Sequence, residues 1–215
     1  MKTIKKILPS VFILMGPPLS GKGTQSEMLA NHFGFIHFSL GDILREKSKN
    51  DKIIKKTMEE GKLLPNKIVN QIFAASFPDL EKSRGIVIDG YPRNLNQARF
   101  LVDFLAKLKK DFLVIYLEVK EDFLLDRLLK RKYCPVCHEV FKDNETICPV
   151  CGVELVKRED DDPKVLENRL KMFNKNTMKA IKFFEKQRKL IKVDGEKTIE
   201  EVFKEILGRL DEFSY

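Results

Sequence analysis

Residues 16–24 (GPPLSGKGT) have the composition of a loop that binds phosphate. Glycines at both ends of such a loop let successive backbone N–H groups turn inward, and a helix that begins at its end adds the positive end of its dipole. Lys22 would then reach the β- and γ-phosphates of a nucleotide as a point charge. The motif predicts a phosphate loop (P-loop), although by itself it would equally serve a GTPase, a motor or a transport ATPase.

The four cysteines of the chain form two Cys-Pro-Val-Cys pairs, Cys134/Cys137 and Cys148/Cys151, separated by ten residues. Each C-x₂-C pair bends the backbone so that two thiolates point at one ion, and two pairs complete a closed tetrahedral site. The spacing therefore predicts structural Zn²⁺, with another thiophilic ion or a redox-active dithiol pair as the alternatives. We expect His138 to be an exposed loop residue, because four thiolates already close the site. We also expect the metal to order residues 132–157, which have few apolar side chains.

The chain has 215 residues, enough for one buried core with small inserts. Its 40 Lys and Arg against 32 Asp and Glu give a net charge of +8, which suits nucleotides, nucleic acid or a membrane surface without choosing among them. The apolar run 11–15 is too short for the core of a secretory signal peptide. No segment approaches the roughly 20 apolar residues of a membrane span. We therefore expect a cytoplasmic protein that does not bind a membrane.

Short apolar runs alternate with amphipathic helical stretches, which is the pattern of a parallel α/β sheet. Five runs that hold β-branched or aromatic residues and no proline are predicted strands: 11–15, 35–38, 86–89, 112–118 and 190–193. Helices are predicted at 24–33, from Ser39 onward, at 95–110, from about 163 to 188, and at 199–210. Gly34 is expected to end the first of these helices. Capping is expected from Ser39, from Asn94 and from Thr198 with Glu201.

Two segments interrupt this alternation. Residues 40–78 hold only helical patterns between two strands, and residues 132–157 hold the cysteines with short β-like pieces. Both are predicted to be inserts on one core. The sequence thus predicts an α/β fold of three layers around a five-stranded parallel sheet, whose core is formed by residues 1–39, 79–131 and 158–215.

Seven motifs occur in order along the chain: GPPLSGKGTQ (16–25), SLGDILR (39–45), GKLL (61–64), DGYPR (89–93), DRLLKR (126–131), REDD (158–161) and NRL (168–170). Together they resemble the adenylate kinase family over essentially the whole chain, and GKGTQ followed by DGYPR is the most specific part. The resemblance implies reversible phosphoryl transfer from ATP·Mg²⁺ to AMP, ATP + AMP = 2 ADP. It also implies a monomer whose insert 40–78 binds the monophosphate and whose insert 132–157 is a zinc-binding lid.

The resemblance also implies roles for individual residues. Cations that surround the transferring phosphoryl group would be catalytic: Lys22, Arg93, Arg127, Arg158 and Arg169. Contacts with ATP would come from Gly16, Ser20, Gly21, Lys22, Gly23, Thr24, Arg127, Arg131 and Lys197. Contacts with AMP would come from Ser39, Leu40, Arg45, Lys62, Leu63, Leu64, Gly90, Arg93, Gln97, Arg158 and Arg169. Asp89 would orient Mg²⁺ through water, and Pro92 matches a family position with a cis peptide bond.

The acceptor base is the point on which the motifs disagree. Gln97 matches the glutamine that hydrogen-bonds adenine in AMP-specific relatives, whereas UMP/CMP-type relatives tend to carry Asn there. Leu40 stands where adenylate kinases usually carry a Thr or Ser hydroxyl, and a leucine cannot hydrogen-bond a base. AMP is therefore the expected acceptor, with UMP or CMP as the alternative. A shortened stretch between the cysteine pairs leaves ATP or GTP open as the donor.

Two other classes of function remain as alternatives. A nucleic-acid-binding protein could use a zinc ribbon and positive charge, but the basic residues are dispersed and the cysteine segment lacks an aromatic or Arg-rich reading surface. A P-loop module that senses nucleotides without kinase activity would be expected to lack some of the arginines, yet every matching position is filled. We therefore expect ATP and AMP as partners, and no nucleic acid.

Overall fold

The computed structural model describes residues 8–80, 83–137, 139–141, 145–157 and 161–213. Its core is a five-stranded sheet in the order β2-β3-β1-β4-β7, in which every neighbouring pair is parallel. The strands are β1 (Val11–Met15), β2 (Ile36–Ser39), β3 (Ile86–Asp89), β4 (Phe112–Glu118) and β7 (Leu190–Asp194). The predicted sheet is confirmed, and the predicted strand ends agree to within one residue.

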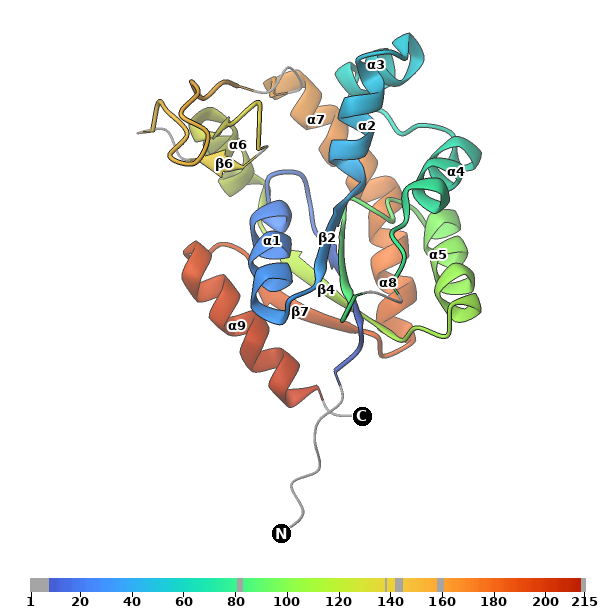
Figure 1. The fold of residues 1–215 in the computed structure, drawn as a ribbon. Helices are drawn as coiled ribbons and strands as arrows, with labels where there is room; N and C mark the ends of the chain where they lie inside the picture. Colours follow the sequence, from blue (N-terminus) through green and yellow to red (C-terminus); the bar gives the residue numbers. More distant parts are fainter. Residues whose placement is uncertain (1–7, 81–82, 138, 142–144, 158–160, 214–215) are drawn as a thin grey trace.

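Helices cover both faces of the sheet (Figure 1). On one face lie α1 (Lys22–Phe33) and α9 (Ile199–Glu212), and on the other lie α5 (Leu95–Lys107) and α8 (Met178–Lys186). The central strand β1 is buried on both sides, because Phe12 and Leu14 pack toward α1 and α9 while Val11 and Ile13 pack toward α5 and α8. This two-sided burial explains why the strand is an unbroken apolar run.

The helix ends are fixed by the capping residues that the sequence indicates. Ser39 Oγ accepts the Asp42 N–H (3.3 Å), and Asn94 Oδ1 accepts the Gln97 N–H (3.0 Å). Thr198 and Glu201 form a reciprocal capping box at the start of α9. Gly34 ends α1 at φ 65°, a left-handed conformation that glycine adopts without strain.

Both inserts extend from the end of the sheet at which the strands terminate (Figure 1). Between β2 and β3 lie α2 (Leu40–Ser48), α3 (Lys52–Glu59) and α4 (Asn66–Ser76). After α6 (Glu121–Lys130), the cysteine segment contains the short antiparallel pair β5 (Lys132–Tyr133) and β6 (Val140–Phe141), and isolated bridges join Tyr133 to Val156 and Ile147 to Glu154. The absence of strands from the first insert and of a long helix from the second agrees with the prediction, for the residues described.

The predicted continuous helix over residues 163–188 is wrong in one respect. The structure has α7 (Pro163–Met172), a π-helical turn η1 (Phe173–Thr177) and then α8. A π-turn absorbs one extra residue without ending the helix, so a 3.6-residue pattern does not reveal it. Within the described part of the chain, none of the helices has the length and apolar character needed to cross a lipid bilayer.

Candidate active site

Two adjoining pockets open at the carboxyl ends of β1, β2 and β3, where ligands bind in open α/β sheets. The first encloses about 550 Å³ including solvent at its mouth, between the P-loop, the segment after β3, and the helix α7 with η1. The second, of about 430 Å³, lies under α2 and α4. Leu63, Gly90 and Arg93 line both pockets, so the two spaces meet at these residues.

The P-loop joins β1 to α1, and its glycines are required by its shape. A Cβ on Gly16 would lie 2.6 Å from Ser20 Oγ and 2.9 Å from the Leu117 carbonyl oxygen, so no side chain fits there. Gly21 has φ +90°, which disfavours other residues. Lys22 Nζ donates to the Pro17 carbonyl oxygen (2.7 Å) and lies 3.4 Å from Ser20 Oγ. The ammonium group is thus held inside the loop.

Several cations converge on this ammonium group. Burial lowers the pKa of Lys22 to about 8, the nearby Asp89 carboxylate partly opposes this effect, and Arg93, Arg169 and Arg131 add to it. The pocket therefore holds an excess of positive charge in the absence of a bound anion. An anion that entered it would favour the charged form of Lys22 and raise that pKa.

Asp89 supplies the negative charge next to these cations. Its Oδ1 atom is buried and accepts no hydrogen bond from the described residues, and its Oδ2 lies 3.7 Å from where a Cβ on Gly23 would be. An unpaired buried carboxylate oxygen beside a phosphate loop fits a hydrated Mg²⁺ carried by a nucleotide, because oxygen and water are the ligands that Mg²⁺ prefers.

Arg45 and Arg93 each lie next to a glycine, Gly41 and Gly90 respectively. The Arg45 guanidinium pairs with Asp42, and its buried Nε has no partner among the described residues. Arg93 Nε donates to the Gly90 carbonyl oxygen (3.1 Å). A Cβ on Gly41 would lie 3.4 Å from the Arg45 guanidinium, and one on Gly90 would lie 3.8 Å from the Arg93 guanidinium.

The second pocket has apolar walls and one amide. Leu40 and Leu64 are buried, and the other apolar side chains of the lining are Leu44, Met58, Leu63 and Val69. Gln97 is only 1% exposed and lines the same space. The Lys62 ammonium pairs with Glu60 (2.7 Å) at the surface, so Lys62 borders the pocket with the rest of its length. The shape and polarity suit a planar heteroaromatic ring.

Three further predicted cations, Arg127, Arg131 and Lys197, do not line either pocket. Arg127 donates to the Gly195 carbonyl oxygen (2.6 Å) and reaches that of Leu19 in the P-loop (3.4 Å), and burial lowers its pKa. Arg131 forms a two-pronged ion pair with Asp161. The Lys197 ammonium is paired with Glu205 on α9 (2.7 Å). Arg158 lies outside the described residues.

The structure also brings in residues that the sequence did not single out. Thr177, in the π-turn, donates its hydroxyl to the Arg93 carbonyl oxygen (2.9 Å). Tyr91, whose peptide bond to Pro92 is cis as the family position implies, donates its hydroxyl to Asn70 Oδ1 (2.8 Å). Arg131 and Asp161 lie in the DRLLKR and REDD motifs, but the sequence analysis did not predict that they pair, and nothing in the sequence pattern pointed to Thr177 or Asn70.

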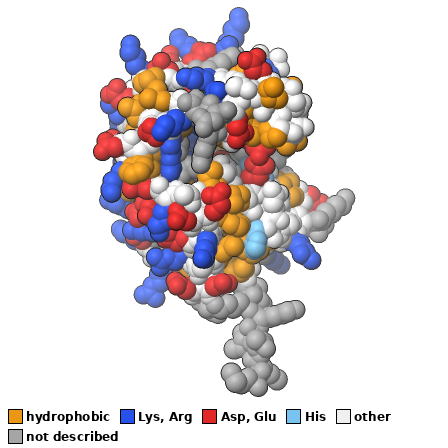
Figure 2. All heavy atoms as spheres, turned by 90° about the vertical axis from the view of Figure 1, so that its left-hand side faces the viewer, with side chains coloured by type: hydrophobic (Ala, Val, Ile, Leu, Met, Phe, Trp, Pro, Cys, Tyr) orange, Lys and Arg blue, Asp and Glu red, His pale blue; other side chains and the backbone are white. Residues whose placement is uncertain are grey.

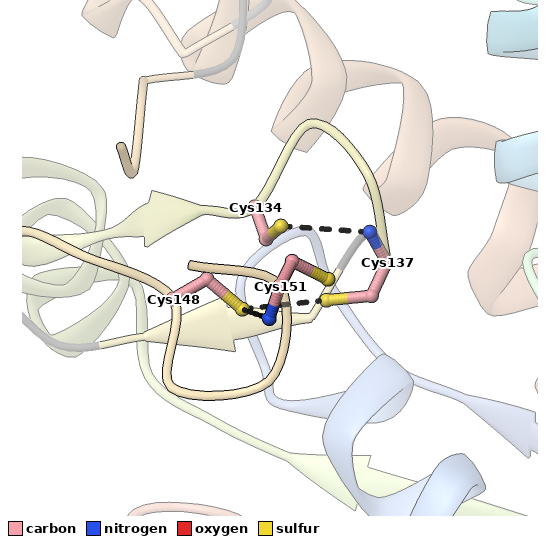
Figure 3. A group of neighbouring side chains, drawn as sticks. All are labelled: Cys134, Cys137, Cys148 and Cys151. Atoms are coloured by element: carbon pink, nitrogen blue, oxygen red, sulfur yellow. Dashed lines mark hydrogen bonds between the residues drawn. The ribbon is translucent and has the colours of Figure 1, made fainter. Parts of the chain in front are cut away.

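The four cysteines come together in the second insert (Figure 3). Their Sγ atoms all lie within 4.8 Å of one another, and those of Cys137 and Cys148 are 3.7 Å apart. Zn–S bonds of about 2.3 Å in a tetrahedron require sulfurs about 3.8 Å apart. Backbone N–H groups of Val136 and Cys137 point to Cys134 Sγ, and that of Cys151 points to Cys148 Sγ. Such donors stabilise thiolates, so the residues present fit a tetrahedral metal ion.

Comparison with known proteins agrees with this architecture. The family model described as Adenylate kinase matches residues 14–189. An adenylate kinase of Chlamydia pneumoniae is 39% identical over 204 residues, which cover 92% of this chain and 96% of the relative. Adenylate kinases of Petrotoga mobilis and Thermotoga petrophila are 34% and 36% identical, over 94% and 91% of this chain and 98% and 94% of their own lengths. The chain therefore belongs to the adenylate kinase family.

Proposed function

We propose that this protein transfers the terminal phosphoryl group of ATP to AMP and releases two molecules of ADP. The observation that carries the proposal is the meeting of two pockets at Arg93. One is a cationic pocket built on the P-loop, and the other is an apolar pocket with a single amide. A donor phosphate chain in the first pocket and a monophosphate whose base fills the second would bring the reacting groups together at this junction. The division of the chain into a core, a monophosphate-binding insert (40–78) and a lid insert (132–157) is part of the proposal.

Phosphoryl transfer depends mainly on positioning and on positive charge around the transferring group. We assign donor phosphates to the P-loop amides and Lys22, with Arg127, Arg131 and Arg169 closing around them. We assign the acceptor phosphate to Arg45 and Arg93, whose planar guanidinium groups suit bidentate contact with phosphate oxygens. When bound with ATP, Mg²⁺ would neutralise charge on the phosphate oxygens, and Asp89 would orient its water ligands.

We propose further that Cys134, Cys137, Cys148 and Cys151 bind Zn²⁺ as a structural ion. Four cysteine ligands leave no open coordination position, so the ion would hold the lid segment together without taking part in the reaction. The close approach of the four Sγ atoms supports this assignment over a dithiol pair.

The charge on one face of the molecule supports nucleotides over a nucleic acid as the anionic partner. On the face shown in Figure 2, Lys and Arg side chains are interspersed with Asp and Glu side chains and with hydrophobic ones. A protein that tracks a nucleic-acid backbone needs a continuous basic stripe or patch. We therefore assign the functional excess of positive charge to the first pocket, and keep a cytoplasmic monomer as part of the proposal.

Assays with separate acceptors test the proposed reaction. Purified protein with ATP·Mg²⁺ is expected to form ADP rapidly from AMP and slowly from CMP, UMP, GMP or dTMP, as followed by chromatography. If CMP or UMP were preferred, the proposed reaction would stand but the acceptor would be a pyrimidine nucleotide. Leu40 would then match the apolar residue of pyrimidine-type relatives. Binding of ATP without turnover of any monophosphate would refute the kinase assignment and favour a sensing module.

The lowered pKa of Lys22 predicts a pH limb in the kinetics. Lysine contacts phosphate as a cation, so kcat/KM for ATP is expected to fall as pH rises through about 8, where the free protein loses this charge. Bound phosphates raise the pKa, so the corresponding fall in kcat should lie at higher pH. Rate profiles between pH 6 and 10 measure both limbs. A kcat/KM that stays level up to pH 10 would contradict the assignment.

A further inference from the structure

The side-chain amide of Gln97 is held in one orientation at the wall of the second pocket. The Arg93 backbone N–H donates to Gln97 Oε1 (2.7 Å), and Gln97 Nε2 donates to Asn66 Oδ1 (3.2 Å). A backbone N–H can only donate, so the atom that faces Arg93 has to be the oxygen of the amide. Turning the amide by 180° would place two donors against each other at Arg93 and two acceptors against each other at Asn66.

The orientation of Asn66 is itself determined by a second backbone group. The Gln97 backbone N–H donates to Asn94 Oδ1 (3.0 Å), which identifies the other amide atom of Asn94 as its nitrogen. Asn94 Nδ2 then donates to Asn66 Oδ1 (2.7 Å), so this oxygen accepts from both Asn94 and Gln97. Two backbone N–H groups thus set the direction of three side-chain amides in sequence.

The fixed amide leaves a defined pattern for a ligand. An amide oxygen has two acceptor sites and an amide nitrogen has two hydrogens. After the bonds to Arg93 and Asn66, Gln97 Oε1 can therefore accept one more hydrogen bond and Gln97 Nε2 can donate one more. Adenine presents an exocyclic amino donor at position 6 next to ring-nitrogen acceptors, whereas a 6-oxo purine presents an acceptor at position 6. An amide free to turn would serve both bases equally, but this one favours a 6-amino group at Oε1.

No other uncharged polar side chain lines this pocket among the residues that the structure describes. Leu40 occupies the position where a hydroxyl would otherwise be available, and the remaining side chains of the lining are apolar or charged. Among the side chains of this lining, discrimination between amino and oxo groups therefore depends on Gln97 and on what holds it.

We propose that Asn66, itself held by Asn94, is a specificity-determining positioning residue. It fixes the Gln97 amide so that the acceptor pocket selects a base with an exocyclic amino group over its oxo analogue. This inference rests on the proposed function and deepens it, because it names the chemical group of the acceptor that is recognised. Asn66 acts through Gln97 and takes no part in the transfer step.

The matched pair Asn66→Leu and Asn66→Asp tests the inference. Leu has nearly the shape of Asn but accepts no hydrogen bond, whereas Asp retains an acceptor toward Asn94 and Gln97. The acceptors are AMP and inosine monophosphate, which differ in the amino or oxo group at position 6 and in the hydrogen that N1 carries in the oxo form. The measured quantity is the ratio of kcat/KM for AMP to kcat/KM for inosine monophosphate. Asn50→Leu, at an exposed position of the same insert, is a control for the introduction of leucine.

Asn66→Leu is expected to lower this ratio by about three- to tenfold, which is the range for the loss of one hydrogen bond. The loss should appear mainly in KM for AMP, because a positioning residue for the base leaves the phosphoryl transfer step unaltered. Asn66→Asp and Asn50→Leu should keep the ratio of the unmodified protein. An unchanged ratio in Asn66→Leu, or an equal fall in Asn66→Asp, would overturn the inference.

Asn94→Asp provides a second test that keeps the cap of α5. Asp accepts the Gln97 backbone N–H as well as Asn does, so the helix start is preserved. It places an acceptor against Asn66 Oδ1, so the Asn66 amide is expected to turn and present its nitrogen to Gln97 Nε2. The ratio should again fall by about three- to tenfold, while thermal unfolding remains close to that of the unmodified protein. An unchanged ratio here would also count against the inference.

Failure of the inference and failure of the proposed function give different results. If the unmodified protein turns over no monophosphate, the proposed function fails and the inference fails with it. If it prefers AMP and the variants keep the full ratio, the inference alone fails. If pyrimidine monophosphates are the better acceptors, the comparison is made with CMP and UMP, which differ in the same exchange of amino for oxo.

Discussion

Replacing Lys22 with Met is expected to make the protein more stable while removing nearly all of its turnover. The pKa of Lys22 is lowered from 10.5 to about 8, so the charged side chain costs free energy in the nucleotide-free fold at pH values below about 8. This cost disappears as pH rises from about 8 to 10.5. Its full value would be about 3 kcal/mol at about 1.4 kcal/mol per pKa unit. Because Lys22 as a whole is partly exposed and donates to Pro17, we expect a net gain of about 1–2 kcal/mol.

The same substitution removes a cation from the transferring phosphoryl group. Loss of one preorganised donor of this kind lowers kcat by about a hundredfold to a thousandfold. Thermal unfolding and ADP formation measure the two effects, and the midpoint should rise by about 2–8 °C at pH 7. Lys182→Met, at an exposed position of α8, should leave both quantities close to their original values. A Lys22→Met protein that is less stable, or that keeps a tenth of its activity, would contradict the role assigned to the P-loop lysine.

Removal of the metal is expected to unfold residues 132–157 and to leave the sheet intact. The buried part of this insert is small, with Cys134, Cys148 and Leu155 at its centre, and the side chains of Val136 and Val150 are exposed. Structural zinc contributes about 10–16 kcal/mol of apparent binding free energy at neutral pH in small metal-ordered domains. If loss of the metal lowers the unfolding free energy of the rest of the chain by about a third of this value, the thermal midpoint falls by roughly 10 °C.

Chelation followed by amide NMR distinguishes loss of the insert from loss of the fold. Resonances of the insert should collapse toward disordered positions while those of β1 and the P-loop persist, and added Zn²⁺ should restore them. Cys148→Ala should behave like the chelated protein. Val150→Ser, which changes an exposed side chain between two ligands, should not. Unchanged melting after verified loss of the metal would mean that the insert is held by other contacts.

Local chemistry explains why much of the architecture was predictable from sequence. The strand β1 is a continuous apolar run because it is buried on both faces, and the caps Ser39, Asn94 and Thr198 satisfy backbone groups within three residues of themselves. The convergence of the cysteine pairs was predictable because each pair is a local turn and only one such combination exists in the chain.

Contacts between residues far apart in sequence were not predictable in this way. Thr177 reaches the Arg93 carbonyl across 84 positions, and Asn66 reaches Gln97 across 31. No periodicity or spacing carries such information, because each bond depends on how two elements pack in three dimensions. The pairing of Lys197 with Glu205 likewise depends on how α9 folds back against the segment before it.

The π-turn η1 brings two residues of one long helix, Arg169 and Thr177, to the same side of the helix. In a regular α-helix, residues eight positions apart, such as Arg169 and Thr177, would be offset by about 80° around the axis. Absorbing one extra residue resets the phase, so that the offset falls to about 20°. Arg169 and Thr177 accordingly both line the first pocket. If the same residues formed a regular α-helix without the π-turn, Thr177 would rotate away from Arg93 whenever Arg169 faced the pocket, whereas deletion of one residue from η1 would leave these two side chains in phase.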